Sequence, residues 1–421
     1  MHRSTFRATT AFAALTLAAA GCTSAPPSTG GDDDSIRYLV QQPEDPAALE
    51  LLEEHIAEFE KESGISVELE ALPMGNMRTV LQTQLRSGDG PDVFSWGSGP
   101  GYAGALAEAG LLYDMTAAYD EYDWPIYDFA KERVTFDGRL IGVPGEMETI
   151  GLFYNKTMFA DLGIDEPKNL ADLKAAAETI RDAGTVPIAA SDQEGWQGGH
   201  LLSMALSSRI GPDGMDSLLN GETPWDSPDV VAALRIWKDF HEAGYLPESP
   251  TSISYDSANS MFYAGKAAML PTGSWLIGGI NRNTDFEVGY IPFPAEDGPG
   301  MFSAGLGSGP MISAGSTKTE AALEFVDFLV SPAHGRWTIE NMGTIPAYPV
   351  DTAKADVSPL FAQVIEDTSR LDDSKNPLGY NIDVLTTDVF NQAMWDGVQA
   401  VLTGQQNAEQ VAQTLETSFQ K

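Results

Sequence analysis

The stretch 138–164 restricts the fold of this 421-residue chain more than any other segment. A short apolar run at 140–143 ends at a Pro-Gly pair, which breaks regular structure. A second run at 150–154 is rich in β-branched and aromatic residues and predicts a strand. Glu146 and Glu148 stand between the runs and could belong to an acidic surface loop. A chain that leaves one sheet, crosses a gap and enters another would explain both runs, with Glu148 facing the gap.

Strands and helices alternate along the part of the chain before this stretch. The pattern predicts strands at 36–40 and 65–72 and from Val93, with helices at 47–63 and 77–85. This order is typical of a parallel sheet with right-handed crossovers, in which ligands bind at the carboxyl ends of the strands. The loops at those ends, 41–44 and 96–101, contain the candidate ligand-binding residues Gln42, Glu44, Trp96 and Ser98.

The later part of the chain adds candidates in similar places. Asp192 and Trp196 lie in a polar loop after a strand expected near 186–190. Gly305 begins the glycine-rich piece 305–309, where the backbone can pass close to another lobe or to a ligand, so we interpret it as a second crossing. A third crossing is expected near 345–349.

The charge of the chain restricts its partners. It carries 61 acidic and 24 basic residues, a formal net charge of −37. Such a surface disfavours nucleic acid and anionic membranes and suits an uncharged ligand. The five histidines do not cluster, and no zinc-protease motif or cysteine pair occurs, so we expect no metal and no cofactor.

The first 35 residues have the composition of a targeting segment. A basic start and a small apolar run predict a secretory signal peptide at 1–21, followed by Cys22, the single cysteine of the chain. Its position resembles a lipobox, in which this thiol is acylated; simple cleavage that leaves a free cysteine is the alternative. Residues 22–35 then form a flexible tether rich in Pro, Gly, Ser and Asp. The body beyond is too long for one core and suits two lobes.

Several motifs carry a resemblance to a known family. The pattern GxPxxxExxxLxYNKxxFxxxGI at 142–164 is similar to the crossover segment of extracellular sugar-binding proteins of ABC importers, the class of maltose-binding protein. The strings GPDVFSWG at 90–97, FYAGKAAM at 262–269 with the following GSW, and GTIP at 343–346 extend the resemblance over most of the body. The resemblance departs at Gly99, where the family member compared has an aspartate.

This resemblance implies an α/β fold of two lobes with three hinge crossings. We assign residues 36–146 and 305–345 to lobe I, and 147–304 and 346–421 to lobe II. Glu148 would accept sugar hydroxyls, and aromatic rings would stack on the sugar. The implied aromatic residues are Trp96, Trp196, Trp275 and Trp395. A lid over the lobe's own core is the alternative for Trp96, and a core position is the alternative for Trp395. The other tryptophans considered are assigned to structural roles: Trp124, Trp225, Trp237 and Trp337.

The expected function is therefore a monomeric lipoprotein on the outer face of the cytoplasmic membrane, which binds a mono- or oligosaccharide and delivers it to an ABC permease. We expect no catalysis. The main alternative is a secreted carbohydrate-active hydrolase that uses Glu146 and Glu148 as paired carboxylates. A scaffold or adhesion lipoprotein would not need aromatic residues at several separate loop ends.

Overall fold

The computed structural model describes residues 35–43, 46–352, 355–368 and 378–419, and residues 34–421 form one compact unit. The proposed signal peptide, Cys22, nearly all of the tether and Glu44 lie outside the described residues. Within the described residues, no helix combines the length and the apolar character needed to cross a membrane.

The first lobe is built on a four-stranded sheet of order β13-β3-β1-β2. Its elements are β1 (Ser35–Gln41), α1 (Pro46–Ser63), β2 (Ser66–Leu72), α2 (Met74–Ser87), β3 (Val93–Gly97) and β13 (Ser308–Ile312). β1 pairs in parallel with β2 and β3, which confirms the predicted strand-helix alternation, while β13 is antiparallel to β3. β13 comes from more than 200 positions later in the chain, so its pairing could not be read from local pattern.

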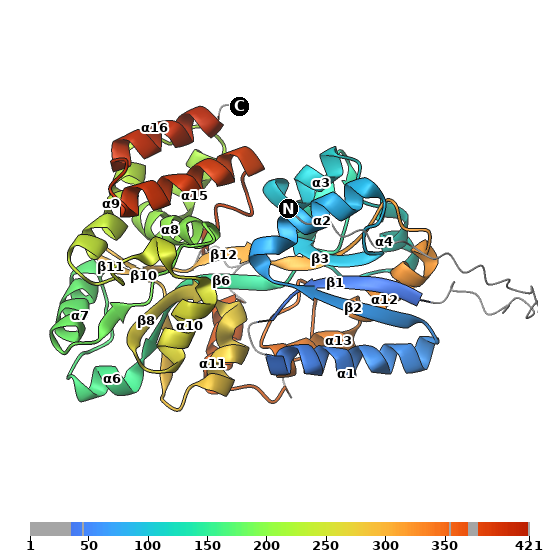
Figure 1. Cartoon of the computed structure of the whole chain (residues 1–421), viewed down its shortest axis with the longest axis horizontal. Helices are drawn as coiled ribbons and strands as arrows, with labels where there is room; N and C mark the ends of the chain where they lie inside the picture. Colours follow the sequence, from blue (N-terminus) through green and yellow to red (C-terminus); the bar gives the residue numbers. More distant parts are fainter. Residues whose placement is uncertain (1–34, 44–45, 353–354, 369–377, 420–421) are drawn as a thin grey trace, which may run out of the picture. The chain divides into compact units, whose positions relative to one another are not determined.

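The alternation of side chains along β1 separates the two faces of this sheet. Tyr38 and Val40 pack with α1 and with α12 (Thr319–Val330), whereas Leu39 packs with α2. We call these the α1 face and the α2 face, and Figure 1 shows the two helices on opposite sides of the sheet.

The second lobe is built on a larger sheet of order β14-β12-β6-β8-β7, with β9 also paired to β6. The strands are β6 (Met147–Asn155), β7 (Val186–Ile188), β8 (Ala267–Gly273), β9 (Val288–Ile291), β12 (Ser303–Leu306) and β14 (Gly379–Tyr380). One side, the α8 face, packs on α8 (Trp196–Leu219), α9 (Pro228–Glu242), α15 (Asp388–Leu402) and α16 (Ala408–Phe419). The other, the α11 face, packs on α10 (Tyr255–Tyr263), α11 (Ile277–Asn283) and α14 (Pro359–Thr368).

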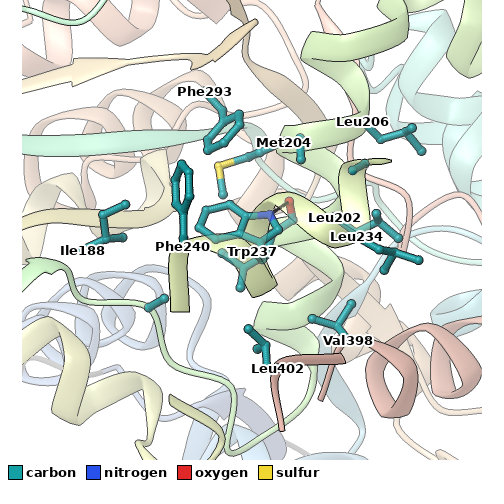
Figure 2. Close-up of a cluster of buried hydrophobic side chains, with 14 of the residues drawn as sticks. Ile188, Leu202, Met204, Leu206, Leu234, Trp237, Phe240, Phe293, Val398 and Leu402 are labelled. Carbon is teal, nitrogen blue, oxygen red and sulfur yellow. Dashed lines mark hydrogen bonds between the residues drawn. The ribbon is translucent and has the colours of Figure 1, made fainter. Parts of the chain in front are cut away.

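Trp237 on α9 centres the core of the α8 face. Its side chain is 2% exposed, and its indole N–H donates to the Leu201 carbonyl at 2.7 Å. Figure 2 shows Phe240, Phe293 and Met204 around its ring. A tryptophan enclosed on all sides, with its one donor satisfied internally, has a structural role, as the sequence analysis assigned.

The chain passes between the lobes near Gly145 and again at Gly307. Val143 donates its N–H to Pro310 of the first sheet at 2.9 Å, and β6 of the second sheet begins four residues later. On the return, β12 of the second sheet leads through Gly307 to β13 of the first. β12 pairs with β6, so residues 305–306, assigned to lobe I from sequence, are strand residues of the second sheet.

The last passage does not follow the predicted boundary after residue 345. Ile345 bridges Met147 and packs on the α11 face, but Ala347 and Tyr348 pack on the α1 face of the first lobe. The Tyr348 hydroxyl donates to the Leu329 carbonyl at 3.1 Å, which holds the segment there before Leu360 rejoins the second lobe. The predicted fold class, two lobes of mixed α/β structure, is confirmed.

The remaining elements are short, except for one helix of 13 residues, α7. They are η2 (Pro100–Gly104), α3 (Ala105–Glu108), α4 (Thr116–Tyr122), α5 (Asp128–Lys131), η3 (Glu132–Val134), β4 (Thr135–Phe136), β5 (Arg139–Leu140), α6 (Lys156–Asp161), α7 (Leu170–Asp182), η4 (Pro250–Ser252), η5 (Ser274–Leu276), β10 (Phe293–Ala295), β11 (Gly298–Met301), α13 (Pro332–Trp337) and η6 (Thr338–Met342).

Candidate ligand-binding site

A cavity of about 500 Å³ lies between the lobes and takes its walls from both. Gln41 and Gly97, at the carboxyl ends of β1 and β3, face it from the first lobe. Glu148 near the start of β6 and Trp275 just after β8 face it from the second. The cavity therefore occupies the place that a parallel sheet of this kind offers to a ligand.

Three aromatic rings of the second lobe are locked together in the cavity wall. The Trp275 indole N–H donates to the Tyr255 hydroxyl at 2.8 Å, and that hydroxyl is 2.8 Å from Thr272 Oγ1. The Trp196 ring meets Tyr255 edge to face with a centroid separation of 4.8 Å. Because these contacts fix the rings before any ligand arrives, little conformational entropy would be lost on binding.

Arg78 of α2 lies among aromatic rings from both lobes. Its guanidinium carbon is 5.0 Å from the Tyr102 ring and 6.0 Å from Trp96 in the first lobe, and 5.5 Å from Trp395 in the second. Arg78 also forms an ion pair with Asp388, the first residue of α15. One rim of the cavity is thus a cation-π cluster that joins the lobes.

Unpaired indole donors distinguish several of these rings. The N–H groups of Trp96, Trp196 and Trp395 are buried and have no hydrogen-bond partner among the described residues. A buried donor without a partner costs free energy, which a ligand that accepts the hydrogen bond would recover.

Two carboxyl groups stand at the crossing, both beside Gly307. A Cβ atom added to Gly307 would lie 2.8 Å from Glu146 Oε1 and 3.0 Å from Glu148 Oε2, so both carboxyls face the same small volume. Burial, together with the neighbouring charges of Glu146 and Asp383, raises the pKa of Glu148 well above its ordinary value. Burial also raises the pKa of Glu146 to about 7. The absence of a side chain at Gly307 leaves room for both carboxyls.

A second polar group faces Glu148 from the segment after β14. Asn381 Nδ2 donates to Glu148 Oε1 at 3.4 Å, and His200 Nε2 lies 3.6 Å from Asp383 Oδ2. Burial lowers the pKa of His200 to about 3 and raises that of Asp383 to about 7. At neutral pH the histidine is therefore uncharged and has one donor and one acceptor nitrogen. Apart from Arg78 at its rim, the cavity wall therefore presents neutral or acidic hydrogen-bonding groups.

The structure brings five of the sequence-predicted site residues to the cavity wall: Trp96, Glu148, Trp196, Trp275 and Trp395. Trp196 was expected in a polar loop. In the structure it is the first residue of α8, and from there it reaches the cavity wall.

Four other predicted residues are not part of that wall. Gln42 is exposed, while its neighbours Gln41 and Pro43 line the cavity. The Ser98 hydroxyl accepts from the Gly145 N–H and donates to the Gly307 carbonyl, both at 3.2 Å, so it ties the two crossings together. Asp192 is fully buried and accepts from the Gly198 N–H at 2.8 Å, inside the first turn of α8. Gly305 pairs with Glu148 across the sheet.

Several residues that face the cavity gave no signal in the sequence: Arg78, Tyr102, His200, Tyr255, Asn381 and Asp383. Arg78 and His200 sit on helices that merely looked amphipathic or apolar, and Asp383 follows a two-residue strand. Trp337, assigned to a structural role, also lines the cavity. Within the described part of the chain, no group of three or more His, Cys, Asp or Glu side chains is placed to hold a metal ion.

Comparison with known proteins places the chain in a class. The family described as "Bacterial extracellular solute-binding protein" matches residues 44–335, and the chain belongs to this family.

Among individual relatives, the chain is 27% identical over 314 residues to the multiple sugar-binding protein of Streptococcus mutans, a match that covers 71% of this chain and 72% of that protein. It is 25% identical to the maltodextrin-binding protein MdxE of Bacillus subtilis over 322 residues, 73% of this chain and 72% of that protein. Among solved structures, a chitin oligosaccharide binding protein superposes with a TM-score of 0.81 at 24% identity, covering 92% of this chain and 98% of the other. The last of these supports the fold alone.

Proposed function

We propose that this protein is a carbohydrate receptor that delivers a mono- or oligosaccharide to an ABC transporter. The observation that carries the proposal is the cavity itself: aromatic rings from both lobes surround buried carboxyl, amide and imidazole groups. A sugar ring has apolar C–H faces and a polar rim of hydroxyls, so stacked rings and hydrogen-bond acceptors complement it. Two of the relatives are named as a multiple sugar-binding protein and a maltodextrin-binding protein, and these names support the same class of ligand.

The proposed mechanism is closure of the lobes around the ligand. Trp96 belongs to the first lobe and Trp275 to the second, so a sugar that contacts both stabilises the form in which they face each other. We propose hinges at the crossings near Gly145, at Gly307 and in the segment after Ile345. The closed form would be the one that a permease recognises.

Titration with a panel of mono- and oligosaccharides tests the proposal, with tryptophan fluorescence and thermal unfolding as readouts. Trp275→Ala and Glu148→Gln should each weaken binding of the best ligand at least tenfold, which is about 1.4 kcal/mol. The first removes a stacking surface, and the second replaces a carboxyl group, which can accept through both oxygens, with an amide that accepts through one.

Trp237→Ala is the matched control, because this ring lies in the core and outside the cavity wall. It should lower the free energy of unfolding by about 3–5 kcal/mol and leave the affinity of the folded protein unchanged. Stabilisation by amino acids, peptides or ions, with none by sugars, would remove the carbohydrate assignment. New reducing ends after incubation with oligosaccharides would instead favour the hydrolase that Glu146 and Glu148 suggested.

We also propose that the protein is held as a monomer on the outer face of the cytoplasmic membrane through an acylated Cys22. An extracellular receptor of an importer must stay near its permease, and acyl chains contribute about 0.8 kcal/mol per buried CH₂ group. Cys22→Ser should release an unacylated protein into the medium. Wild-type protein that takes up no labelled fatty acid and is found wholly in the medium would rule out the anchor.

A further inference from the structure

The cavity continues past Glu146 to a second aromatic position. On the α2 side its wall holds Trp96 and Trp395, as described above. On the α1 side the wall is formed by His334 and Trp337 of α13, with the following residues around them: Leu52 of α1, Leu329 of α12, and Thr338 and Met342 of η6. Both carboxyls at the crossing also line the cavity, with Glu146 near Tyr38 of the α1 face and Glu148 near Tyr102 on the α2 side.

Trp337 is held in a fixed orientation. Its ring stacks on His55 of α1 with a centroid separation of 4.2 Å and an interplanar angle of 4°. The side chain is only partly buried, so part of it is open at the cavity wall. A core tryptophan such as Trp237 is 2% exposed and donates to a core carbonyl, whereas Trp337 lies in the cavity wall and is only partly enclosed.

A chain of hydrogen bonds fixes the chemistry of His334. His55 Nδ1 lies 3.2 Å from a Glu58 carboxylate oxygen, and His55 Nε2 lies 3.1 Å from His334 Nδ1. The carboxylate can only accept, so His55 Nδ1 carries the proton, and the bare His55 Nε2 accepts from His334 Nδ1. His334 Nε2 is then left as an acceptor.

The charge state of His334 agrees with this assignment. Burial, and then the neighbouring His55, lower the pKa of His334 to about 3, so the ring is neutral at neutral pH. A neutral histidine with a bare Nε2 on the cavity wall accepts a hydrogen bond from a hydroxyl group and offers nothing to an anion.

We propose that His334 and Trp337 form a second sugar subsite, which binds a further ring of the same oligosaccharide that occupies the cavity beside Trp275. The ring would stack near Trp337, one hydroxyl would donate to His334 Nε2, and another would accept from the Trp337 indole N–H. This inference rests on the proposed function and deepens it, because it makes the ligand an oligosaccharide rather than a monosaccharide. A cavity of about 500 Å³ falls within the range that holds ligands larger than one ring.

The test measures affinity as a function of ligand length. Titrations use three series, namely glucose to maltotetraose, xylose to xylotetraose, and N-acetylglucosamine to its tetramer, and continue with the series that binds wild type. Trp337→Ala should weaken the longest ligand about tenfold, as expected for the loss of one stacked ring. It should leave the shortest bound member unchanged, whereas Trp275→Ala weakens every length.

Further variants separate binding from folding. Trp337→Phe keeps an aromatic ring, so it should keep much of the gain in affinity with ligand length. His334→Phe keeps the packing but removes the hydrogen-bond acceptor, so it should lose part of that gain. Trp124→Phe is the control, because this first-lobe indole donates to Asp327 and does not line the cavity. Thermal unfolding identifies the variants that fold, and if Trp337→Ala does not, the comparison of Trp337→Phe with Trp337→Leu replaces it.

Three results would overturn the subsite. In the first, the folded Trp337 and His334 variants weaken short and long ligands equally. In the second, these variants weaken neither short nor long ligands. In the third, the wild-type protein binds monosaccharides alone. If no sugar binds wild type, the proposed function fails, and the subsite fails with it; the first three results leave the proposed function standing.

Discussion

At the scale of single residues, the partner of the indole N–H separates the tryptophans better than burial does. Trp96 and Trp237 are 5% and 2% exposed, yet the first has an unpaired donor beside the cavity and the second donates to a core carbonyl. Trp225 shows that an unpaired donor is not sufficient, because it is unpaired and lies wholly in the core. An unsatisfied donor together with a place in the cavity wall indicates a hydrogen bond to the ligand, whereas Trp275, whose donor is satisfied by Tyr255, offers the face of its ring.

The sequence analysis picked out four tryptophans that the structure brings to the cavity wall, but it missed Tyr102, Tyr255 and most of the polar residues there. A tryptophan in a loop after a strand stands out, because neither strand nor helix periodicity accounts for it. Asp383 and Asn381 reach Glu148 only through the pairing of β14 with β12, across a separation of more than 200 residues. No local pattern encodes such a contact.

Asp383 gives a prediction for the dependence of stability on pH. Burial raises its pKa from 3.8 to about 7, so the folded protein keeps a proton that the unfolded chain has lost. Stability associated with this group is fully present below pH 3.8 and is lost as the pH rises through about 7. Asp383→Asn cannot titrate, and its free energy of unfolding should rise relative to wild type by roughly 2–4 kcal/mol between pH 4 and pH 7.

Urea unfolding at several pH values checks this expectation. Asp128→Asn is the control, because it makes the same substitution at a 98% exposed side chain outside the cavity wall. If the difference between Asp383→Asn and wild type stays constant across the range, the buried acid is not protonated in the folded state.

At the scale of elements, the two crossings near Gly145 and Gly307 behave as one unit. The Gly307 N–H donates to the Glu146 carbonyl at 2.8 Å, and the Ser98 hydroxyl links Gly145 to Gly307. Glycine-rich composition predicted the second crossing, but not that it packs backbone to backbone against the first. The third passage was predicted less well, because contacts of Tyr348 and Ala347 with the first lobe hold a segment whose sequence resembles a simple crossing.

Gly145→Ala tests this packing. A Cβ atom at Gly145 would overlap the backbone of Gly307 and Ser308, which cannot move without disturbing both sheets. The free energy of unfolding should fall by about 1–3 kcal/mol, as for an overpacked core position. Gly298→Ala is the matched control, since a Cβ there has no atom within 4 Å, and it should stay within about 0.5 kcal/mol of wild type. Equal stability of the two variants would show that the crossings do not pack as described.

At the scale of the whole body, residues 34–421, the lobes touch at one rim of the cavity. Arg78 of the first lobe pairs with Asp388 of the second, with side chains 26% and 50% exposed. A Cβ atom on Gly101 would lie 2.7 Å from the Thr386 carbonyl oxygen, so the backbones there are also close. An ion pair with this exposure contributes about 0.2–1 kcal/mol, which shifts a two-state equilibrium only severalfold. The rim therefore biases the lobes toward each other without locking them.

Small-angle X-ray scattering can follow this equilibrium. If the lobes close on the ligand, a saturating sugar should reduce the radius of gyration of the wild-type protein, because each lobe gains contacts to the ligand only in the closed form. The double variant Arg78→Ala, Asp388→Ala removes the bias at the rim and should be at least as expanded as wild type when free, and sugar should bring both to the same radius. Free wild-type protein could already be closed. In that case the free double variant should have the larger radius of gyration of the two proteins. Equal radii for both proteins, with and without a sugar that fluorescence shows to be bound, would mean that binding does not close the cleft.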